Sequence, residues 1–262
     1  MNEFLNDCGM AEPLQIAIRG FSTIDRGVRL LPQPYALIGR DQRADVPLEH
    51  RLVSRRHLYL QVIDSQAFWV DLESRAGTIY RGQSCKYGWL DQGETIGVGP
   101  FELQRVVNSR PALPSPTTGE ASRLSPLVAR DDRRNPLPEV SLEFLNGPSS
   151  SASWPMNRVM SLIGSASGCK FRLADPSVSP FHCSLVRTPH GLWVVDLLGS
   201  EPITVNDAIV RYALLSDQDV LRVGRYRIRV RCLFQASVSG AAEAGEAYRN
   251  TFSGRSIPAL SW

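Results

Sequence analysis

Tyr35-Ala36-Leu37-Ile38-Gly39-Arg40 and Val53-Ser54-Arg55-Arg56-His57 are the two stretches that decide how this chain is organised. The first is an apolar run that ends at a glycine and an arginine. The second places a hydroxyl and two guanidinium groups before another apolar run, residues 58–63. Arginine offers a forked pair of donors that suits phosphate, and serine adds one directed donor. The pattern therefore predicts an anion-binding site in loops at the ends of strands.

Short apolar segments continue on both sides of these stretches, separated by Gly, Pro, Asp and Ser. Residues 14–19 alternate apolar and polar, and β-branched and aromatic residues are frequent in the later segments. No stretch keeps a helical period for three turns. We therefore expect an all-β fold in which residues 14–107 form a β-sandwich.

The chain then changes character twice. Residues 108–138 are rich in proline, serine and threonine, which is typical of a flexible linker. Residues 235–262 begin with a run of Ala, Gly, Ser and Glu, and we expect a poorly ordered tail.

The segment after the linker repeats the segment before it. Leu-Ile-Gly at 37–39 recurs at 162–164, and Val-Asp-Leu at 70–72 recurs at 195–197, both with an offset of 125 residues. The offset holds without a gap across some sixty positions. This period is too long for a solenoid repeat, so residues 139–234 should form a second β-sandwich with its own core.

Composition narrows the function classes. A net charge of +3 over 262 residues does not favour nucleic acid or membrane binding. The five cysteines form no CxxC pair or Cys/His ligand spacing, so we expect no metal and no cofactor. Residues 1–13 lack the apolar core of a signal peptide, and no window of 18 residues is uninterruptedly apolar. We expect a cytoplasmic protein with free thiols.

Four spaced motifs in the first copy resemble those of a forkhead-associated (FHA) domain: Gly39-Arg40, Ser54 to His57, Asp71 to Thr78, and Ile96 to Gly99. The resemblance implies an eleven-stranded β-sandwich of the SMAD/FHA type. It also implies that loops at one end of the sandwich bind phosphothreonine in a partner peptide, without catalysis.

The resemblance assigns roles to individual residues. Arg40 would grip the phosphate, Ser54 would hydrogen-bond a phosphate oxygen, and Arg55 would add a second positive contact. Arg75 would contact an acidic side chain of the peptide. Three further residues would support the loops: Gly39, His57 and Gly77.

Two positions depart from the family pattern. Ala76 stands where the family has an asparagine that contacts the peptide main chain, and Arg81 replaces a second asparagine. Losing one such contact costs about 1–3 kcal/mol if its partner stays unpaired. We therefore expect phosphate capture to be intact and peptide positioning to be altered.

The second copy departs further. Arg40 becomes Ser165, Arg55 becomes Pro180, and Glu201 places an anion where a phosphopeptide would lie. We interpret residues 139–234 as a degenerate FHA-like domain used for protein contact.

Two further patterns in the sequence have alternative interpretations. Ser54, His57 and Asp71 share residue types with a catalytic triad, but no Gly-x-Ser-x-Gly elbow accompanies them. Residues 225–231 alternate arginine with apolar residues, which predicts a solvated strand face or, alternatively, a basic stripe for an acidic partner.

The sequence thus predicts a non-enzymatic adaptor that binds a phosphothreonine-containing protein, such as a Ser/Thr kinase or its substrate. We expect no small-molecule substrate and no membrane partner. Thr117 and Thr118 in the linker are either plain linker residues or phosphorylation sites read by the first domain. The alternative function is a structural protein in which neither copy binds phosphate.

Overall fold

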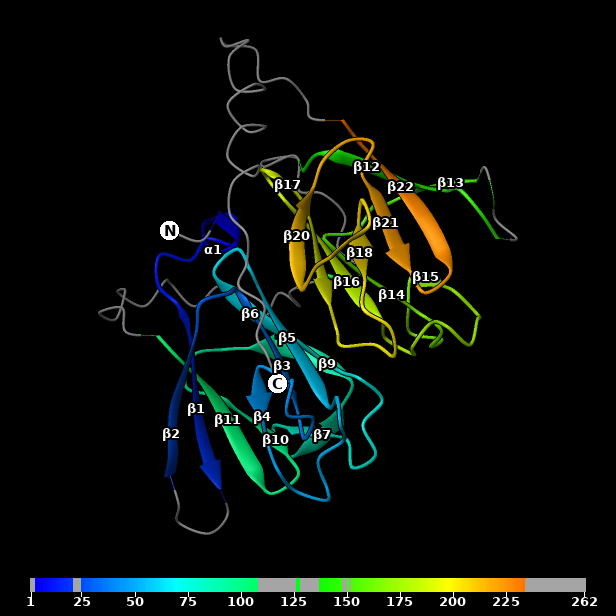
Figure 1. Cartoon of the computed structure of the whole chain (residues 1–262). Coiled ribbons are helices and arrows are strands. Elements are labelled where there is room, and N and C mark those ends of the chain that lie inside the picture. Colours follow the sequence, from blue (N-terminus) through cyan, green and yellow to red (C-terminus); the bar gives the residue numbers. More distant parts are fainter. Residues whose placement is uncertain are drawn as a thin grey trace, which may run out of the picture.

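The computed structural model describes residues 3–20, 25–107, 126–127, 137–147, 150 and 152–233. These residues form one short helix, α1 (Glu3–Asp7), and four β-sheets that make two β-sandwiches (Figure 1). The predicted all-β fold with two sandwiches is confirmed. The predicted tail and most of the predicted linker, including Thr117 and Thr118, lie outside the described residues.

The first sandwich contains eleven strands within the described ranges. They are β1 (Leu14–Gly20), β2 (Asp25–Leu31), β3 (Tyr35–Gly39), β4 (Val46–Pro47), β5 (Leu58–Ile63), β6 (Gln66–Asp71), β7 (Thr78–Tyr80), β8 (Gln83–Cys85), β9 (Tyr87–Leu90), β10 (Thr95–Val98) and β11 (Phe101–Val106). One sheet has the order β2-β1-β11-β10-β7-β8, and the other has the order β4-β3-β5-β6-β9.

The second sandwich repeats this arrangement in its described part. Its strands are β12 (Glu139–Phe144), β13 (Ser153–Pro155), β14 (Met160–Gly164), β15 (Phe171–Arg172), β16 (Cys183–Thr188), β17 (Gly191–Asp196), β18 (Thr204–Val205), β19 (Ala208–Ile209), β20 (Tyr212–Leu215), β21 (Val220–Val223) and β22 (Tyr226–Leu233). The sheet orders are β13-β12-β22-β21-β18-β19 and β15-β14-β16-β17-β20. Strands β14 to β17 each begin 125 residues after β3 to β6, as the sequence repeat predicts.

Burial along the strands shows which faces are covered. Strand β1 alternates, with Leu14, Ile16 and Ile18 buried, as expected when one face of a strand packs on a core. By contrast, every residue of β3, β16 and β17 is buried. These strands are therefore covered on both faces, and the second covering layer is the other sandwich.

A single hydrophobic cluster crosses between the sandwiches. It joins Tyr35 and Leu37 of β3 to Leu162, Val186 and Trp193 of the second sandwich. A second cluster lies entirely within the second sandwich. The core of the first sandwich therefore continues into the interface with the second sandwich, whose own core is the second cluster. The duplicated sheets share an apolar interface, which lowers the apolar area left in water.

Helix α1 bridges the two sandwiches. The Phe4 ring is fully buried and stacks on the Trp193 ring with a centroid distance of 4.2 Å. The Asp7 carboxylate accepts a hydrogen bond from Trp193 Nε1 (2.7 Å) and lies 2.9 Å from His190 Nδ1. His190, in the turn between β16 and β17, thus contacts α1. Burying a phenylalanine side chain contributes about 2–3 kcal/mol, so a single helical turn stabilises the domain contact.

No helix in the described part of the chain is long and apolar enough to cross a membrane. All five cysteines are free thiols, and four of them are buried.

Candidate phosphate-binding loops

The predicted site residues lie on three loops at one end of the first sandwich. The main-chain amide of Arg40, after β3, donates to the Ser54 carbonyl (2.9 Å), and the Asp41 amide donates to the Arg55 carbonyl (3.1 Å). These bonds place the β3–β4 loop against the β4–β5 loop. Arg40 and Arg55, which are 15 positions apart in the sequence, therefore lie at the same end of the sandwich. We call the part of this end that carries Arg40, Ser54, Arg55 and Arg75 the rim.

Gly39 permits this close approach. A Cβ atom added at Gly39 would lie 2.2 Å from the Arg55 carbonyl oxygen and 2.8 Å from its carbonyl carbon. Both distances are far below van der Waals contact, and both atoms belong to the backbone. Any side chain at position 39 would therefore separate the two loops that carry the arginines.

Ser54 connects the rim to a third loop. Its hydroxyl oxygen accepts a hydrogen bond from the main-chain amide of Arg75 (3.0 Å), which lies between β6 and β7. The hydroxyl proton of Ser54 is not used in that bond, so it can still be donated to an anion. The structure therefore brings Arg40, Ser54, Arg55 and Arg75 together; their role in binding stays a prediction.

The buried side chain of His57 connects two of these loops. Its fully buried ring accepts a hydrogen bond at Nδ1 from the Ser54 amide (3.2 Å) and donates from Nε2 to the Gly77 carbonyl (3.1 Å). Burial lowers the pKa of His57, and Asp71 opposes this effect. The ring is therefore neutral with its proton on Nε2, and its two bonds hold the Ser54 and Gly77 loops at a fixed separation.

The same contacts separate these residues from a catalytic triad. His57 Nδ1 bonds the main-chain amide of Ser54, and the Ser54 hydroxyl bonds the Arg75 amide. A nucleophile and base require a bond between the hydroxyl and the ring. Asp71 instead accepts hydrogen bonds from the hydroxyl groups of Ser74 and Thr78, both at 2.6 Å. Asp71 therefore orders the β6–β7 loop.

The charged side chains at the rim are unevenly paired. Arg55 is 73% exposed, and its guanidinium lies 3.6 Å from the Asp41 carboxylate. Asp41 is held more closely by Arg43 (3.0 Å), whose hydrogen bonds lower the pKa of Asp41 to about 2. Arg40 is exposed, and no carboxylate within the described ranges lies within ion-pair distance of it. The rim thus presents three exposed cations, of which Arg55 is weakly paired, while Arg40 and Arg75 have no ion pair within the described ranges.

The two departures from the family pattern have different structural settings. Ala76 is exposed between Arg75 and Gly77, so the rim offers no side-chain amide there. Arg81 lies in the β7–β8 turn with a φ of 50°, and its guanidinium contacts Glu94 at 2.7 Å and Asp91 at 3.6 Å. These ion pairs occupy the guanidinium, so Arg81 does not replace the missing amide.

The second sandwich keeps the scaffold of this rim without its cations. The Ser200 amide donates to the Ser179 hydroxyl (2.8 Å), and the Ser179 amide donates to Nδ1 of His182 (3.1 Å). These bonds repeat those of Arg75, Ser54 and His57. A Cβ atom at Gly164 would lie 2.0 Å from the Pro180 carbonyl oxygen. The duplicated bonds are therefore part of the fold, and the arginines are the feature that distinguishes the first copy.

Sequence reasoning missed the role of Arg56. Its Nη1 atom donates to the carbonyl oxygens of Phe181 (2.6 Å) and Leu197 (3.2 Å) in the second sandwich. Arg56 is therefore an interdomain contact, whereas its neighbour Arg55 faces solvent. No sequence signal separates them, because both are arginines in one loop.

The four arginines of residues 225–231, in β22 and just before it, are partly paired. Arg225 contacts Asp175 at 2.7 Å, and Arg229 and Arg231 contact Glu143 at 3.4 and 3.2 Å. Such exposed pairs contribute little stability. Two carboxylates thus meet four arginines, so this face keeps an excess of positive charge.

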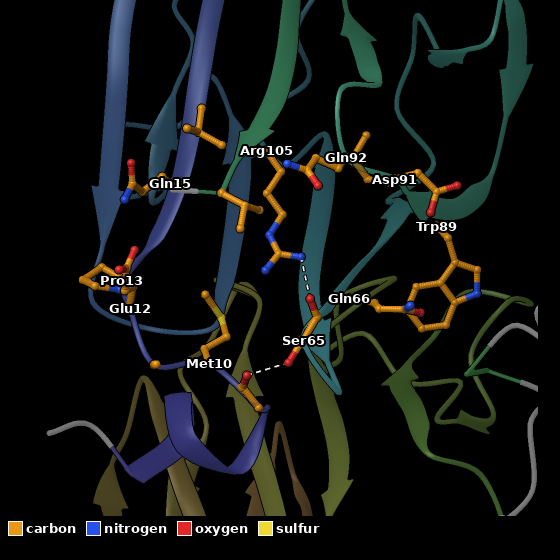
Figure 2. A pocket seen from close by; sticks show the side chains of 15 residues that line it. Met10, Glu12, Pro13, Gln15, Ser65, Gln66, Trp89, Asp91, Gln92 and Arg105 are labelled. Carbon is orange, nitrogen blue, oxygen red and sulfur yellow. Dashed lines mark hydrogen bonds between the residues drawn. The ribbon is translucent and has the colours of Figure 1, made fainter. Parts of the chain in front are cut away.

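A separate hollow of about 540 Å³ lies beside α1 and contains none of the predicted site residues. Figure 2 shows Arg105 and Ser65 facing each other across it, with Met10 and Gln15 nearby. Arg105 Nη1 donates to the Ser65 carbonyl (2.8 Å), and burial lowers the pKa of Arg105. This contact holds β11 against the β5–β6 turn, so Arg105 has a structural role.

Comparisons with known proteins agree with this architecture. A family model described as "FHA domain" matches residues 36–99. A second model, described as "Inner membrane component of T3SS, cytoplasmic domain", matches residues 143–232. None of the curated proteins compared with the chain matches it.

Three similar solved structures cover about one third of the chain each. An FHA domain from an analysis of phosphothreonine-dependent FHA domain interactions is 30% identical and covers 36% of this chain and 95% of that chain, with a TM-score of 0.33. The FhaA FHA domain complexed with the intracellular domain of Rv3910 is 30% identical, with 35% and 99% covered and a TM-score of 0.33. The FHA domain of CT664 from Chlamydia trachomatis is 18% identical, with 36% and 96% covered and a TM-score of 0.34.

The two matched models and the 30% identity over 95% of a solved FHA domain show that the chain belongs to the family of FHA-domain proteins.

Proposed function

We propose that the chain is a phosphothreonine-dependent adaptor whose first domain, residues 14–107, binds a phosphorylated partner protein. The observation that carries this proposal is the joint placement of Arg40, Ser54 and Arg55 on one rim. Two guanidinium groups and a free hydroxyl proton match the oxygens and double charge of a phosphate monoester. The similar FHA domain studied for phosphothreonine-dependent interactions supports the same ligand.

Each rim residue has a distinct proposed task. Arg40 pairs with the phosphate, because its guanidinium has no competing carboxylate in the described structure. Ser54 donates its hydroxyl proton to a phosphate oxygen while its lone pair holds the Arg75 amide. Arg55 adds a second positive charge, weakened by Asp41. Arg75 is exposed and contacts a peptide side chain beside the phosphothreonine.

The second domain, residues 139–234, is proposed to be a degenerate FHA-like module for protein contact. Ser165 and Pro180 stand in the positions of Arg40 and Arg55, and the exposed Glu201 adds a negative charge to the rim. The two positions that supply the proposed phosphate contacts of the first domain therefore carry no cation in this domain. We propose that the protein is not an enzyme, that it is cytoplasmic, and that a Ser/Thr kinase acts upstream of it.

The test is a calorimetric titration of the full chain with phosphothreonine peptides and with the same peptides in unphosphorylated form. The phosphorylated form should bind at least tenfold more tightly. Arg40→Ala should weaken binding by about 30- to 150-fold, because a charge-assisted contact contributes about 2–3 kcal/mol. Arg19→Ala removes an exposed arginine from β1 and serves as the matched control. Equal affinity for both peptide forms across the library would refute the proposal.

A second candidate is a structural protein in which neither copy binds phosphate. The match of residues 143–232 to the cytoplasmic domain of an inner-membrane component of T3SS favours it, since such a component belongs to an assembly. Under this candidate, the wild type and the Arg40→Ala variant would capture the same partner equally, and phosphatase treatment of the partner would change nothing.

A further inference from the structure

A cleft between the two domains adjoins the predicted rim. Its volume is about 540 Å³. Both domains line it, and the residues that matter here are Asp41, Arg43, Arg55 and Arg56 of the first domain and Ser179 and Ser200 of the second. The cleft therefore exists only because the two sandwiches pack together.

On the side of the second domain, the cleft is lined by residues equivalent to rim residues of the first domain. Ser179 occupies the position equivalent to Ser54, and Ser200 the position equivalent to Arg75. The Ser179 hydroxyl accepts from the Ser200 amide (2.8 Å) and donates to the Ser200 hydroxyl oxygen (3.3 Å), so the Ser200 hydroxyl proton can be donated to a ligand. The hydroxyl groups thus persist where the second domain has lost its own arginines, and arginines of the first domain line the same cleft.

The charges in the cleft are not balanced. Its lining contains three guanidinium groups and one carboxylate, Asp41. Asp41 pairs with Arg43 and Arg55. Arg56 has only neutral partners, the carbonyl oxygens of Phe181 and Leu197, and no carboxylate in the described chain lies within ion-pair distance of it. The lining therefore carries a net charge of +2.

Arg56 has charged neighbours of both signs. Burial lowers the pKa of Arg56, and Asp196 acts in the opposite direction. Arg43 and Arg55 lower the pKa of Arg56 further by repulsion, and Asp41 raises it. An anion in the cleft would relieve this repulsion among like charges.

We propose that the cleft is a second phosphate-binding site, built by Arg43 and Arg56 of one domain with Ser179 and Ser200 of the other. Its ligand is a phosphorylated side chain of a partner protein, whose charge of about −2 and acceptor oxygens match the lining. A nucleic acid or a membrane surface would need an extended basic face instead. The inference deepens the proposed function, because it adds a second phosphate to the same kind of partner, but it does not use Arg40.

The experiment is a titration of the labelled full chain with inorganic phosphate at constant ionic strength, with chloride as the reference. Nuclear magnetic resonance follows the side-chain Nε–Hε signals of Arg43 and Arg56. Ser200→Asp places a carboxylate in the cleft at an exposed position and should weaken phosphate binding there about tenfold or more. Ser153→Asp, in β13, adds the same charge outside the cleft and should change nothing. Arg40→Ala should leave the Arg43 and Arg56 response intact.

A phosphothreonine peptide is then added to the Arg40→Ala variant. Shifts of Arg43 and Arg56 on peptide binding support a phosphorylated side chain as the ligand, and a response to inorganic phosphate alone overturns that assignment. Signals that do not move with phosphate, or that move equally in Ser200→Asp, overturn the site itself. A failure of the rim would appear separately, as peptide binding that Arg40→Ala leaves unchanged.

Discussion

Gly39→Ala should destabilise the fold and abolish peptide binding together. The added methyl group would lie 2.2 Å from the Arg55 carbonyl oxygen, so the two loops must move apart by about 1 Å to reach van der Waals contact. That movement breaks or stretches the Arg40–Ser54 and Asp41–Arg55 backbone bonds. Two hydrogen bonds contribute about 1 kcal/mol each, and overpacking adds about 1–3 kcal/mol. We expect a loss of about 3 kcal/mol in the free energy of unfolding.

The second copy supplies a matched comparison. Gly164→Ala would bring its methyl group to 2.0 Å from the Pro180 carbonyl oxygen, so its effect on stability should be similar. It should leave phosphopeptide affinity unchanged, because the proposed rim lies in the first domain. At Gly168 an added Cβ atom has no neighbour closer than 3.8 Å, and Gly168→Ala should be neutral in both assays.

The assay is urea unfolding of the full chain, followed by tryptophan fluorescence, together with calorimetric peptide binding on the same preparations. With a slope of about 3 kcal/mol per molar urea, the loss corresponds to a midpoint lowered by about 1 M. A Gly39→Ala variant with an unchanged midpoint would refute the argument from close approach. Equal loss of peptide binding in Gly164→Ala would refute the division of labour between the domains.

Three further outcomes follow from the packing and the buried charges. Burial lowers the pKa of both His57 and His182, so below about pH 6.5 the unfolded chain binds more protons than the folded chain. The urea midpoint should therefore fall as the pH is lowered from 7 to 5. Replacing both histidines with Gln should reduce this dependence of the midpoint on pH. Phe4→Ala should cost about 3–5 kcal/mol and increase amide exchange on β16 and β17, whereas unchanged exchange would contradict the bridging role of α1. Arg211→Met removes the 2.9 Å interdomain ion pair with Asp45 and should lower the free energy of unfolding by about 1–3 kcal/mol. The loss should be greater at pH 7 than at pH 4, where protonation of Asp45 removes the unpaired charge. An equal loss at both pH values would count against a contribution of the ion pair.

Much of the fold and of the candidate site could be predicted from the sequence, because these features depend on local patterns. Alternation in residues 14–19 and turn residues between short apolar runs predict strands with one buried face, and β1 has that form. The 125-residue repeat predicts the duplicated sandwich. The order of Gly39-Arg40 and Ser54 to His57 places both groups in loops at strand ends, where the structure has them.

Only the tertiary structure decided how the copies meet. Strand β17 is buried along its whole length. Its apolar sequence pattern would be the same whether its outer face packed on a neighbouring domain or on another layer of the same domain. Arg55 and Arg56 are equivalent in sequence, but one reaches solvent and the other bonds to Phe181 and Leu197. The interdomain cleft depends on atoms more than 100 residues apart in the chain, and their proximity results from the packing of two complete sheets.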